Sequence, residues 1–264
     1  MKFTKMHGCG NDYIYVDGSK EYIRQEDKPE FARRLSDRHF GIGADGVIFI
    51  NPSMEADFEM EMYNADGSRG EMCGNGIRCV AKYVYDKGLT DKEKISIISA
   101  GKVKVLNITA RDGCAVLVKV NMGKAEILAE EAVVHCGQNY RMTCISMGNP
   151  HAVIFVDDVE GLEVAKIGPY IENHTLFPER INVEFVKVLD RSTLQMRVWE
   201  RGSGETLACG TGACAAVVAA VKKGLTNEQV TVKLPGGDLE IFFDSRENLV
   251  YMTGPATHVF DGEI

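Results

Sequence analysis

Two cysteines stand in the same local context in the two halves of the chain. Cys73 opens a Cys-Gly-Asn-Gly run and Cys209 opens a Cys-Gly-Thr-Gly run, and each run leads into an apolar, helix-like pattern. The first N–H groups of a helix are unpaired and carry partial positive charge, so a thiol placed there is expected to have a lowered pKa. Two such groups facing each other across a cleft suit a reaction that removes a proton from one face of a stereocentre and returns one to the other face.

The glycines in both runs predict a binding function as well. Residues without a Cβ let the backbone come close to a ligand and let its N–H groups face that ligand. A carboxylate is the group that such donors would hold. One run alone is a weak signal, whereas two copies at matching places in the chain are a strong one.

The two runs belong to an internal repeat. Met196–Glu200 aligns with Met60–Asn64, and the same offset places Cys209–Gly212 over Cys73–Gly76 without a gap. The period is far longer than that of solenoid repeats, so it predicts two similar domains in tandem. We expect a first domain over 1–117 and a second over 118–256, with 257–264 as a tail that can return to the first. The turn signal at 111–113 lies near this boundary.

Each copy of the repeat predicts a strand, a turn and a helix. Alternation over 58–63 indicates a strand, 64–68 has turn composition, and apolar residues after Cys73 recur at helical spacing until Gly88 ends the pattern. The second copy does the same up to Gly224, and its helix is apolar nearly all round, so it should be deeply buried. Further strands are expected over 95–98, 194–199 and 230–234. The predicted fold is α+β, with two pseudo-symmetric strand-rich domains, each wrapped around one buried helix.

Composition excludes several function classes. The 264 residues carry a net charge of −8 without any Lys/Arg-rich block, which disfavours nucleic acid and anionic membranes as partners. The start of the chain lacks the apolar region of a signal peptide, and no apolar run is long enough to span a membrane, so a cytoplasmic protein is expected. The eight cysteines form no CxxC and lack a His at ligand spacing, so neither a metal site nor a disulfide framework is predicted.

Polar residues near the two runs suit a site for a zwitterion. Five asparagines lie in Gly/Pro-rich or strand-end contexts, although a single Asn is more often a turn residue; they are Asn11, Asn64, Asn75, Asn149 and Asn182. Glu200 and Arg201 end a strand-like segment before the second cysteine, where they can hold an ammonium and a carboxylate or stay solvated. His151 is either a functional group or a satisfied core histidine.

At these residues the chain resembles the diaminopimelate epimerase family. The resemblance is colinear over essentially the whole chain and is carried by Gly8–Asp12, Tyr63–Ser68, Met72–Arg78, Gly148–His151, Glu200–Thr206 and Ala208–Cys214. It implies interconversion of LL- and meso-diaminopimelate in lysine and peptidoglycan precursor synthesis, in the cytoplasm, with neither pyridoxal phosphate nor a metal. It also implies an active site in the cleft between two domains that close on a small amino-acid substrate, and usually a homodimer.

The resemblance assigns roles to particular residues of this sequence. Cys73 and Cys209 become the base and acid, with His151 and Glu200 supporting the carbon-acid step. The residues that would contact substrate, either through side chains or through backbone N–H groups, are Asn11, Asn64, Gly74, Asn75, Asn149, Asn182, Glu200, Arg201, Gly210 and Thr211. One departure is Gly46, where some members have a Gln; Asp45 or a main-chain group is the candidate to replace that contact.

Two other enzyme classes and a binding module compete with this hypothesis. A proline racemase or hydroxyproline epimerase also uses paired cysteines, but it lacks the Glu200–Thr206 run and needs fewer amide side chains. A cysteine hydrolase with Cys73 as nucleophile and His151 as base needs only one cysteine. A non-catalytic binding module gives no reason for a thiol repeated at a helix start.

Overall fold

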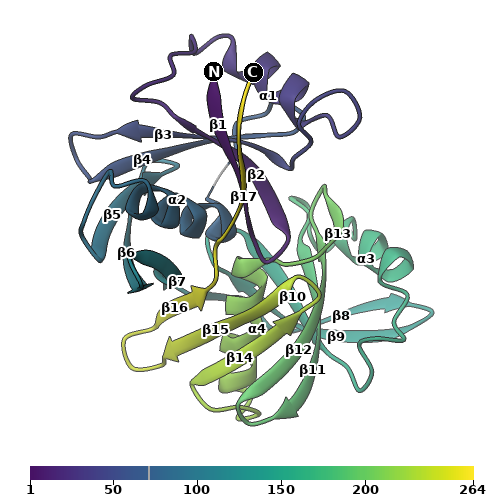
Figure 1. Ribbon diagram of the computed structural model, residues 1–264. Coiled ribbons are helices and arrows are strands. Elements are labelled where there is room, and N and C mark those ends of the chain that lie inside the picture. The colour runs from purple at the N-terminus through teal and green to yellow at the C-terminus, as the bar shows by residue number, and fades with distance from the viewer. Residues whose placement is uncertain (71) are drawn as a thin grey trace. The chain divides into compact units, whose positions relative to one another are not determined.

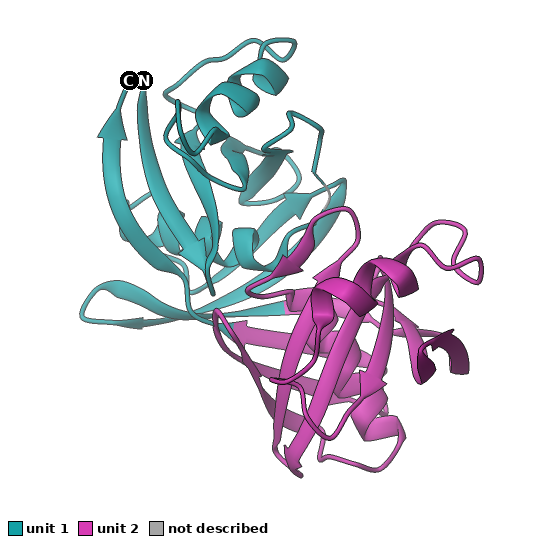
Figure 2. Cartoon of the chain, turned by 90° about the vertical axis from the view of Figure 1, so that its right-hand side faces the viewer, with its two compact units in different colours: residues 1–120, 254–264 teal, residues 121–253 magenta. Residues whose placement is uncertain are grey.

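The computed structural model describes residues 1–70 and 72–264, and the chain divides into two compact units (Figures 1 and 2). Unit 1 comprises 1–120 and 254–264, and unit 2 comprises 121–253. Both units are rich in strands and each contains two helices. The predicted α+β class is therefore confirmed.

Unit 1 contains a mixed sheet of parallel and antiparallel strand pairs, and its helices connect the strands of the parallel pairs (Figure 1). Neighbouring strands in this sheet are β17 (Thr257–Glu263), β1 (Lys2–Gly8), β2 (Asn11–Asp17), β3 (Gly46–Pro52), β4 (Phe58–Asn64), β5 (Lys94–Ser99), β6 (Lys102–Arg111) and β7 (Cys114–Lys124). The β2–β3 and β4–β5 pairs are parallel and the others are antiparallel. The helices are α1 (Lys28–Ser36) and α2 (Gly74–Asp86). The last strand thus pairs with the first.

Unit 2 repeats this order of pairings. Its neighbouring strands are β8 (Glu126–Cys136), β9 (Gln138–Ser146), β10 (Pro150–Phe155), β11 (Asn182–Asp190), β12 (Thr193–Glu200), β14 (Gln229–Leu234), β15 (Gly237–Asp244) and β16 (Leu249–Gly254), with β13 (Gly204–Thr206) added beside β12. The parallel pairs are β10–β11 and β12–β14. The helices are α3 (Val164–Glu172) and α4 (Gly210–Lys222). The internal repeat of the sequence is therefore a repeat of topology.

The second helix of each unit forms as the sequence predicts. In α2 the spaced apolar residues Ile77, Val80 and Val84 are fully buried, and Gly88 follows the C-cap with φ +68°. In α4 nearly every side chain from Gly212 to Ala220 is buried, and Gly224 follows the C-cap with φ +71°. A positive φ carries little steric cost at glycine, which is why both helices end there.

The turn at 111–113 is not the border between the compact units. Asp112 and Gly113 have positive φ values of 50° and 77°, and they form the hairpin that joins β6 to β7. Strand β7 then continues to Lys124, so the division after Val120 falls within a strand. A local turn signal marks a chain reversal and carries no information on which sheet the next strand joins. The domain limits 1–117 and 118–256 stay a prediction.

No helix among residues 1–70 and 72–264 has the length and apolar character needed to cross a membrane.

Candidate active site

Cys73 occupies the N-cap of α2 in unit 1. Its backbone is extended, with φ −112° and ψ 111°, and its Sγ accepts a hydrogen bond from the Gly76 N–H at 3.2 Å. The same sulfur lies 3.3 Å from Oδ1 of Asn11, at the start of β2. The thiol is therefore held at the positive end of a helix, as the sequence predicts.

Asp45, beside Gly46, is hydrogen-bonded to the start of β2. Its Oδ2 accepts from Nδ2 of Asn11 at 2.8 Å and from the backbone N–H of Asp12 at 3.0 Å. A Cβ added to Gly46 would lie 2.1 Å from the backbone oxygen of Tyr63, so a longer side chain does not fit at this point of the sheet. Asn11 is therefore bonded to both Asp45 and Cys73.

The second glycine of the unit 1 run, Gly76, lies close to a strand side chain. A Cβ there would lie 2.8 Å from Cδ1 of Ile48, whose side chain from β3 fills the space beside the first turn of α2. Tyr13 of β2 lies close by; burial raises the pKa of its hydroxyl well above the ordinary value, and the charges of Cys73 and Asp45 add to this. Packing therefore gives Gly76 a structural reason beside the expected approach of a ligand, which stays a prediction.

The other predicted unit 1 residues make local contacts. The Asn75 side chain is buried, and its Oδ1 accepts from Nη2 of Arg78 at 3.0 Å. Arg78 is itself fully buried and donates to the carbonyl oxygens of Gly74 and Pro255. Asn64, at the end of β4, donates to Oγ of Ser68 at 2.9 Å. Asn75 can therefore offer a ligand its backbone more readily than its side chain.

Cys209 occupies the N-cap of α4 in unit 2, with φ −119° and ψ 109°. Its Sγ lies 3.5 Å from Oγ1 of Thr211, and that hydroxyl also accepts from Nδ2 of Asn149 at 3.3 Å. The backbone conformation of the two cysteines is thus nearly the same, whereas their hydrogen-bond partners differ.

The acidity of Cys209 differs from the sequence-based expectation. Burial raises the pKa of its thiol well above the ordinary value, and the carboxyl groups of Glu200 and Glu184 raise it further. The Thr211 hydroxyl acts in the opposite direction but does not outweigh them. The prediction that a helix start lowers this pKa is therefore wrong for Cys209 in this structure, because desolvation and nearby carboxyl groups exceed the helix effect.

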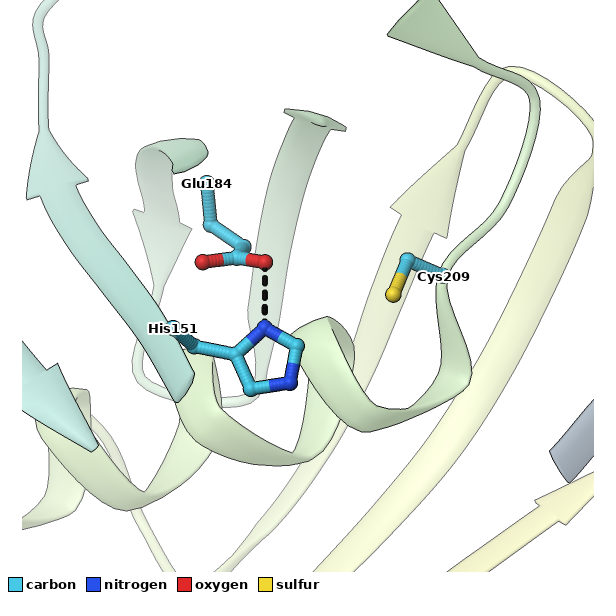
Figure 3. Close-up of side chains that lie close together, drawn as sticks. All are labelled: His151, Glu184 and Cys209. Carbon is cyan, nitrogen blue, oxygen red and sulfur yellow. Dashed lines mark hydrogen bonds and ion pairs between the residues drawn. The ribbon is translucent and has the colours of Figure 1, made fainter. Parts of the chain in front are cut away.

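His151 is fully buried and is bonded at both ring nitrogens. Nδ1 lies 2.7 Å from Oε1 of Glu184, and Nε2 lies 3.0 Å from Oδ1 of Asn149 (Figure 3). A hydrolase that used His151 as a base would need to break one of these contacts, which disfavours that alternative. The Cys209 thiol lies near this pair, since one atom of each of the three side chains lies within 4.8 Å of the others (Figure 3).

Sequence reasoning missed Glu184. It lies on β11 two residues after Asn182, so both side chains leave the same face of the strand. Its signal was a charged residue within the otherwise apolar run Val183–Val186, every member of which is buried. A Cβ on Gly212 would lie 2.6 Å from its Oε1, so Gly212, like Gly76, makes room for a strand side chain.

Glu200, Arg201 and Asn182 lie together at the ends of β11 and β12. Nδ2 of Asn182 donates to the Pro150 carbonyl at 2.8 Å, and its Oδ1 accepts from the Arg201 N–H at 3.0 Å. Burial raises the pKa of Glu200, while hydrogen bonds from Thr206 and Cys209 act against this shift. Glu200 therefore lies beside the Cys209 thiol. Asn182 links the backbone at Pro150 to the backbone at Arg201.

The cluster of His151, Glu184 and Cys209 also has the side-chain types of a metal site. Their ligand atoms lie within 4.8 Å of one another and all three residues are buried. Two ligands at about 2.0–2.2 Å from a tetrahedral zinc would be roughly 3.3 Å apart, whereas His151 and Glu184 approach to 2.7 Å. As arranged, the pair fits a shared proton better than a metal ion.

Solved structures with the same fold define the class of protein. A phenazine biosynthesis protein of the PhzF family from Bacillus anthracis aligns with a TM-score of 0.79 at 14% identity, covering 100% of this chain and 98% of that chain. A hydroxyproline epimerase from Agrobacterium vitis aligns with a TM-score of 0.75 at 14% identity, covering 100% of this chain and 90% of that one. At this identity the likeness shows a shared fold.

Sequence comparison defines the family. The diaminopimelate epimerase family matches residues 3–128 and 143–259. A diaminopimelate epimerase from Acetivibrio thermocellus is 54% identical over 277 residues, which covers 100% of this chain and 98% of that protein. The chain therefore belongs to the diaminopimelate epimerase family.

Proposed function

We propose that this chain interconverts LL- and meso-diaminopimelate by moving the α-proton between two thiols, in lysine and peptidoglycan precursor biosynthesis. The observation that carries the proposal is the placement of Cys73 and Cys209 at matching N-cap positions of α2 and α4, in a chain of this family. One thiolate takes the α-proton from one face of the carbon, and the other thiol gives its proton to the opposite face. The electron pair stays on carbon between these two events.

The raised pKa of Cys209 supports an assignment of the two roles. A thiol whose pKa lies well above the ordinary value stays protonated near neutral pH, which suits the proton donor of the resting enzyme. Cys73 accepts an N–H hydrogen bond from the first turn of α2, which stabilises a thiolate, and donates to Oδ1 of Asn11 while it carries its proton. We therefore assign the base to Cys73 and the acid to Cys209 in the direction that begins from the resting enzyme.

The remaining site residues bind substrate in this proposal. The backbone N–H groups of Gly74–Asn75 and Gly210–Thr211 are donors for a carboxylate at the two helix starts. Polar side chains hold the ammonium and carboxylate groups; they are Asn11, Asn64, Asn149, Asn182, Glu200 and Arg201. Glu200 lies beside Cys209 and His151 joins Asn149 to Glu184, so both support the carbon-acid step. The thiols perform the proton transfer without a cofactor or metal.

Solvent exchange tests the proposed function. The reaction is run in D₂O from pure LL-isomer, and early product and residual substrate are examined by mass spectrometry. The product should carry deuterium at its α-carbon because the donating thiol has exchanged with solvent, while residual substrate stays largely unlabelled. Equal early labelling of both would contradict the two-thiol mechanism, and proline or hydroxyproline labelled in preference would support the alternative epimerases.

A cytoplasmic homodimer completes the proposal. Both points are what the resemblance to the diaminopimelate epimerase family implies, and membership of that family supports them. Light scattering on the purified protein should give the mass of two chains, each of 29.1 kDa. A mass of one chain over the concentration range used for turnover would contradict the dimer.

A further inference from the structure

Glu184 is a buried carboxyl group that the proposed proton transfer does not use. Its relative exposure is 0%, and Oε2 has no hydrogen-bond partner within residues 1–70 and 72–264. An ionised carboxylate with one unpaired buried oxygen carries a large desolvation cost. Burial accordingly raises the pKa of Glu184, against the opposing effect of His151. The hydrogen bond between Oε1 of Glu184 and Nδ1 of His151 is therefore the polar contact that offsets part of this cost.

That bond begins a continuous chain to the Cys209 thiol. Oε1 of Glu184 lies 2.7 Å from Nδ1 of His151, and Nε2 of His151 lies 3.0 Å from Oδ1 of Asn149. Nδ2 of Asn149 donates to Oγ1 of Thr211 at 3.3 Å, and that hydroxyl lies 3.5 Å from Sγ of Cys209. The links come from β11, β10 and the first turn of α4, which are distant in sequence.

The hydrogen-bond directions fix where the protons lie. An amide oxygen can only accept, so with Asn149 donating to Thr211, Nε2 of His151 must carry hydrogen. The contact between Nδ1 and Glu184 then holds one further proton. It is either on the carboxyl group, with a neutral imidazole, or on Nδ1, with a carboxylate. The pair is neutral in both cases, and His151 keeps its Nε2–H throughout.

We propose that Glu184 is a positioning residue of the epimerase reaction. It fixes His151 in the form with hydrogen on Nε2, and it thereby holds Asn149 and Thr211 in place beside Cys209. The proposal rests on the proposed function for its effect on turnover, although its effect on His151 can be measured without substrate.

Unit 1 shows that packing alone does not require a carboxyl group at this place. Ile48 of β3 touches the first turn of α2 at Gly76 as Glu184 of β11 touches the first turn of α4 at Gly212. Both side chains occupy the third position of a strand that pairs in parallel with the strand before it. An isoleucine therefore fills the equivalent space, which makes Glu184→Ile a matched apolar substitution.

Several titratable groups surround His151 and must be considered in any pH measurement. Glu184 faces it from β11, Glu200 acts on it from β12, and Cys209 lies at the head of α4. Cys144 on β9 faces Glu184, and burial raises the pKa of its thiol to about 11. Cys144 therefore stays protonated across the range from pH 6 to 9.

The test compares Glu184→Gln with Glu184→Ile in the full-length protein. The Gln amide can donate to Nδ1 and so preserve the Nε2–H form, whereas Ile cannot. Glu184→Ile should lower kcat by roughly 10- to 100-fold, the range for loss of a group that orients a site residue. Glu184→Gln should stay within about threefold of wild type, since one hydrogen bond is retained. Thermal unfolding of both variants checks that they are folded.

Nitrogen-15 spectra of histidine-labelled protein give a second readout. His151→Gln identifies the signal, which in wild type should show a protonated Nε2 at every pH from 6 to 9. In Glu184→Ile the signal should no longer show hydrogen on Nε2 alone. Three results would each overturn the proposal: wild-type turnover in folded Glu184→Ile, equal losses in both folded variants, or a wild-type His151 without hydrogen on Nε2.

The role of Glu184 can still be tested if a variant does not fold or if the proposed function is wrong. If Glu184→Ile does not fold, the His151 spectra of wild type and Glu184→Gln decide, and loss of the Nε2–H signal in wild type refutes the role. If wild type fails to label diaminopimelate in D₂O, the proposed function is wrong, while the His151 spectra still report on Glu184 alone.

Discussion

The starts of α2 and α4 have the same backbone but different surroundings. Cys73 and Cys209 have φ and ψ values that differ by 10° or less, and each precedes a first turn kept open by a glycine. Behind the first lie an aromatic and an aliphatic side chain, Tyr13 and Ile48. The second instead has the buried His151–Glu184 pair nearby.

The surroundings of Cys209 show that a helix start does not by itself set the acidity of a thiol. The helix start offers both thiols the same N–H groups and the same partial positive charge. Burial and two carboxyl groups nevertheless raise the pKa of Cys209. Their combined effect on this thiol therefore exceeds that of the helix start. In the proposed two-thiol reaction one thiol is the base and the other the acid, and a Cys209 that stays protonated suits the acid.

Of the changes considered, removal of either thiol should lower epimerisation most. Cys73→Ala and Cys209→Ala are each expected to lower epimerisation by roughly 10²- to 10⁴-fold, the usual contribution of one general acid or base. The conversion of LL-diaminopimelate to the meso form measures this. Cys114→Ala, which changes an exposed thiol, is the control. Near wild-type turnover in either test variant would show that the two helix starts are not partners.

Glu200 should matter more than Asn182 in the surroundings of Cys209. Glu200→Gln removes a half-buried carboxyl group beside the thiol and should lower kcat by roughly 10²- to 10³-fold. Asn182→Ala removes bonds to two backbone groups and should cost only about fivefold. Comparison of kcat values decides, with the exposed Glu240→Gln as control. Equal losses would contradict the separation of roles.

The raised pKa of Cys209 predicts its labelling by iodoacetamide. Only the thiolate reacts, so the midpoint of its rate against pH should lie above the ordinary thiol value of about 8.5. Glu200→Gln should move that midpoint down, because loss of a negative charge favours the thiolate. Peptide mapping follows Cys209, with exposed Cys114 as internal reference. A Cys209 midpoint at or below that of Cys114 would refute the burial effect.

A buried carboxyl group in unit 1 gives the smallest predicted effect on activity. Burial alone would raise the pKa of Glu61, but hydrogen bonds from Lys28 and Gln25 hold it at about 2. A lowered pKa adds stability above the unfolded value of about 4.3, and this stability is lost as pH falls towards 2. The pKa of Glu184 is raised, so its contribution to stability falls as pH rises.

Glu61→Gln tests the predicted pH dependence of the stability that Glu61 contributes. It should lower the free energy of unfolding by about 1–3 kcal/mol at pH 7, because buried donors lose a charged acceptor. The difference from wild type should shrink between pH 4.5 and 3, while kcat at neutral pH stays unchanged. Urea unfolding at pH 7, 4.5 and 3 measures it. A difference that grows on acidification would contradict the assignment.

The sequence by itself determined what depends on neighbours along the chain. Periodic apolar residues after Cys73 and Cys209 predicted two buried helices, and Gly88 and Gly224 predicted their ends, because helix geometry repeats within four residues. The internal repeat predicted matching halves, and the short motifs predicted the family. These features were found correctly because each is a local pattern.

Tertiary structure decided what depends on residues far apart in the chain. Glu184 meets His151 only because β10 and β11 pair in parallel, and Gly76 and Gly212 leave room at the helix starts for side chains from other strands. The acidity of Cys209 follows from burial and from carboxyl groups on other strands, which no local pattern encodes. Sequence thus placed the two thiols at helix starts, and the packing of strands against those helices made the thiols different.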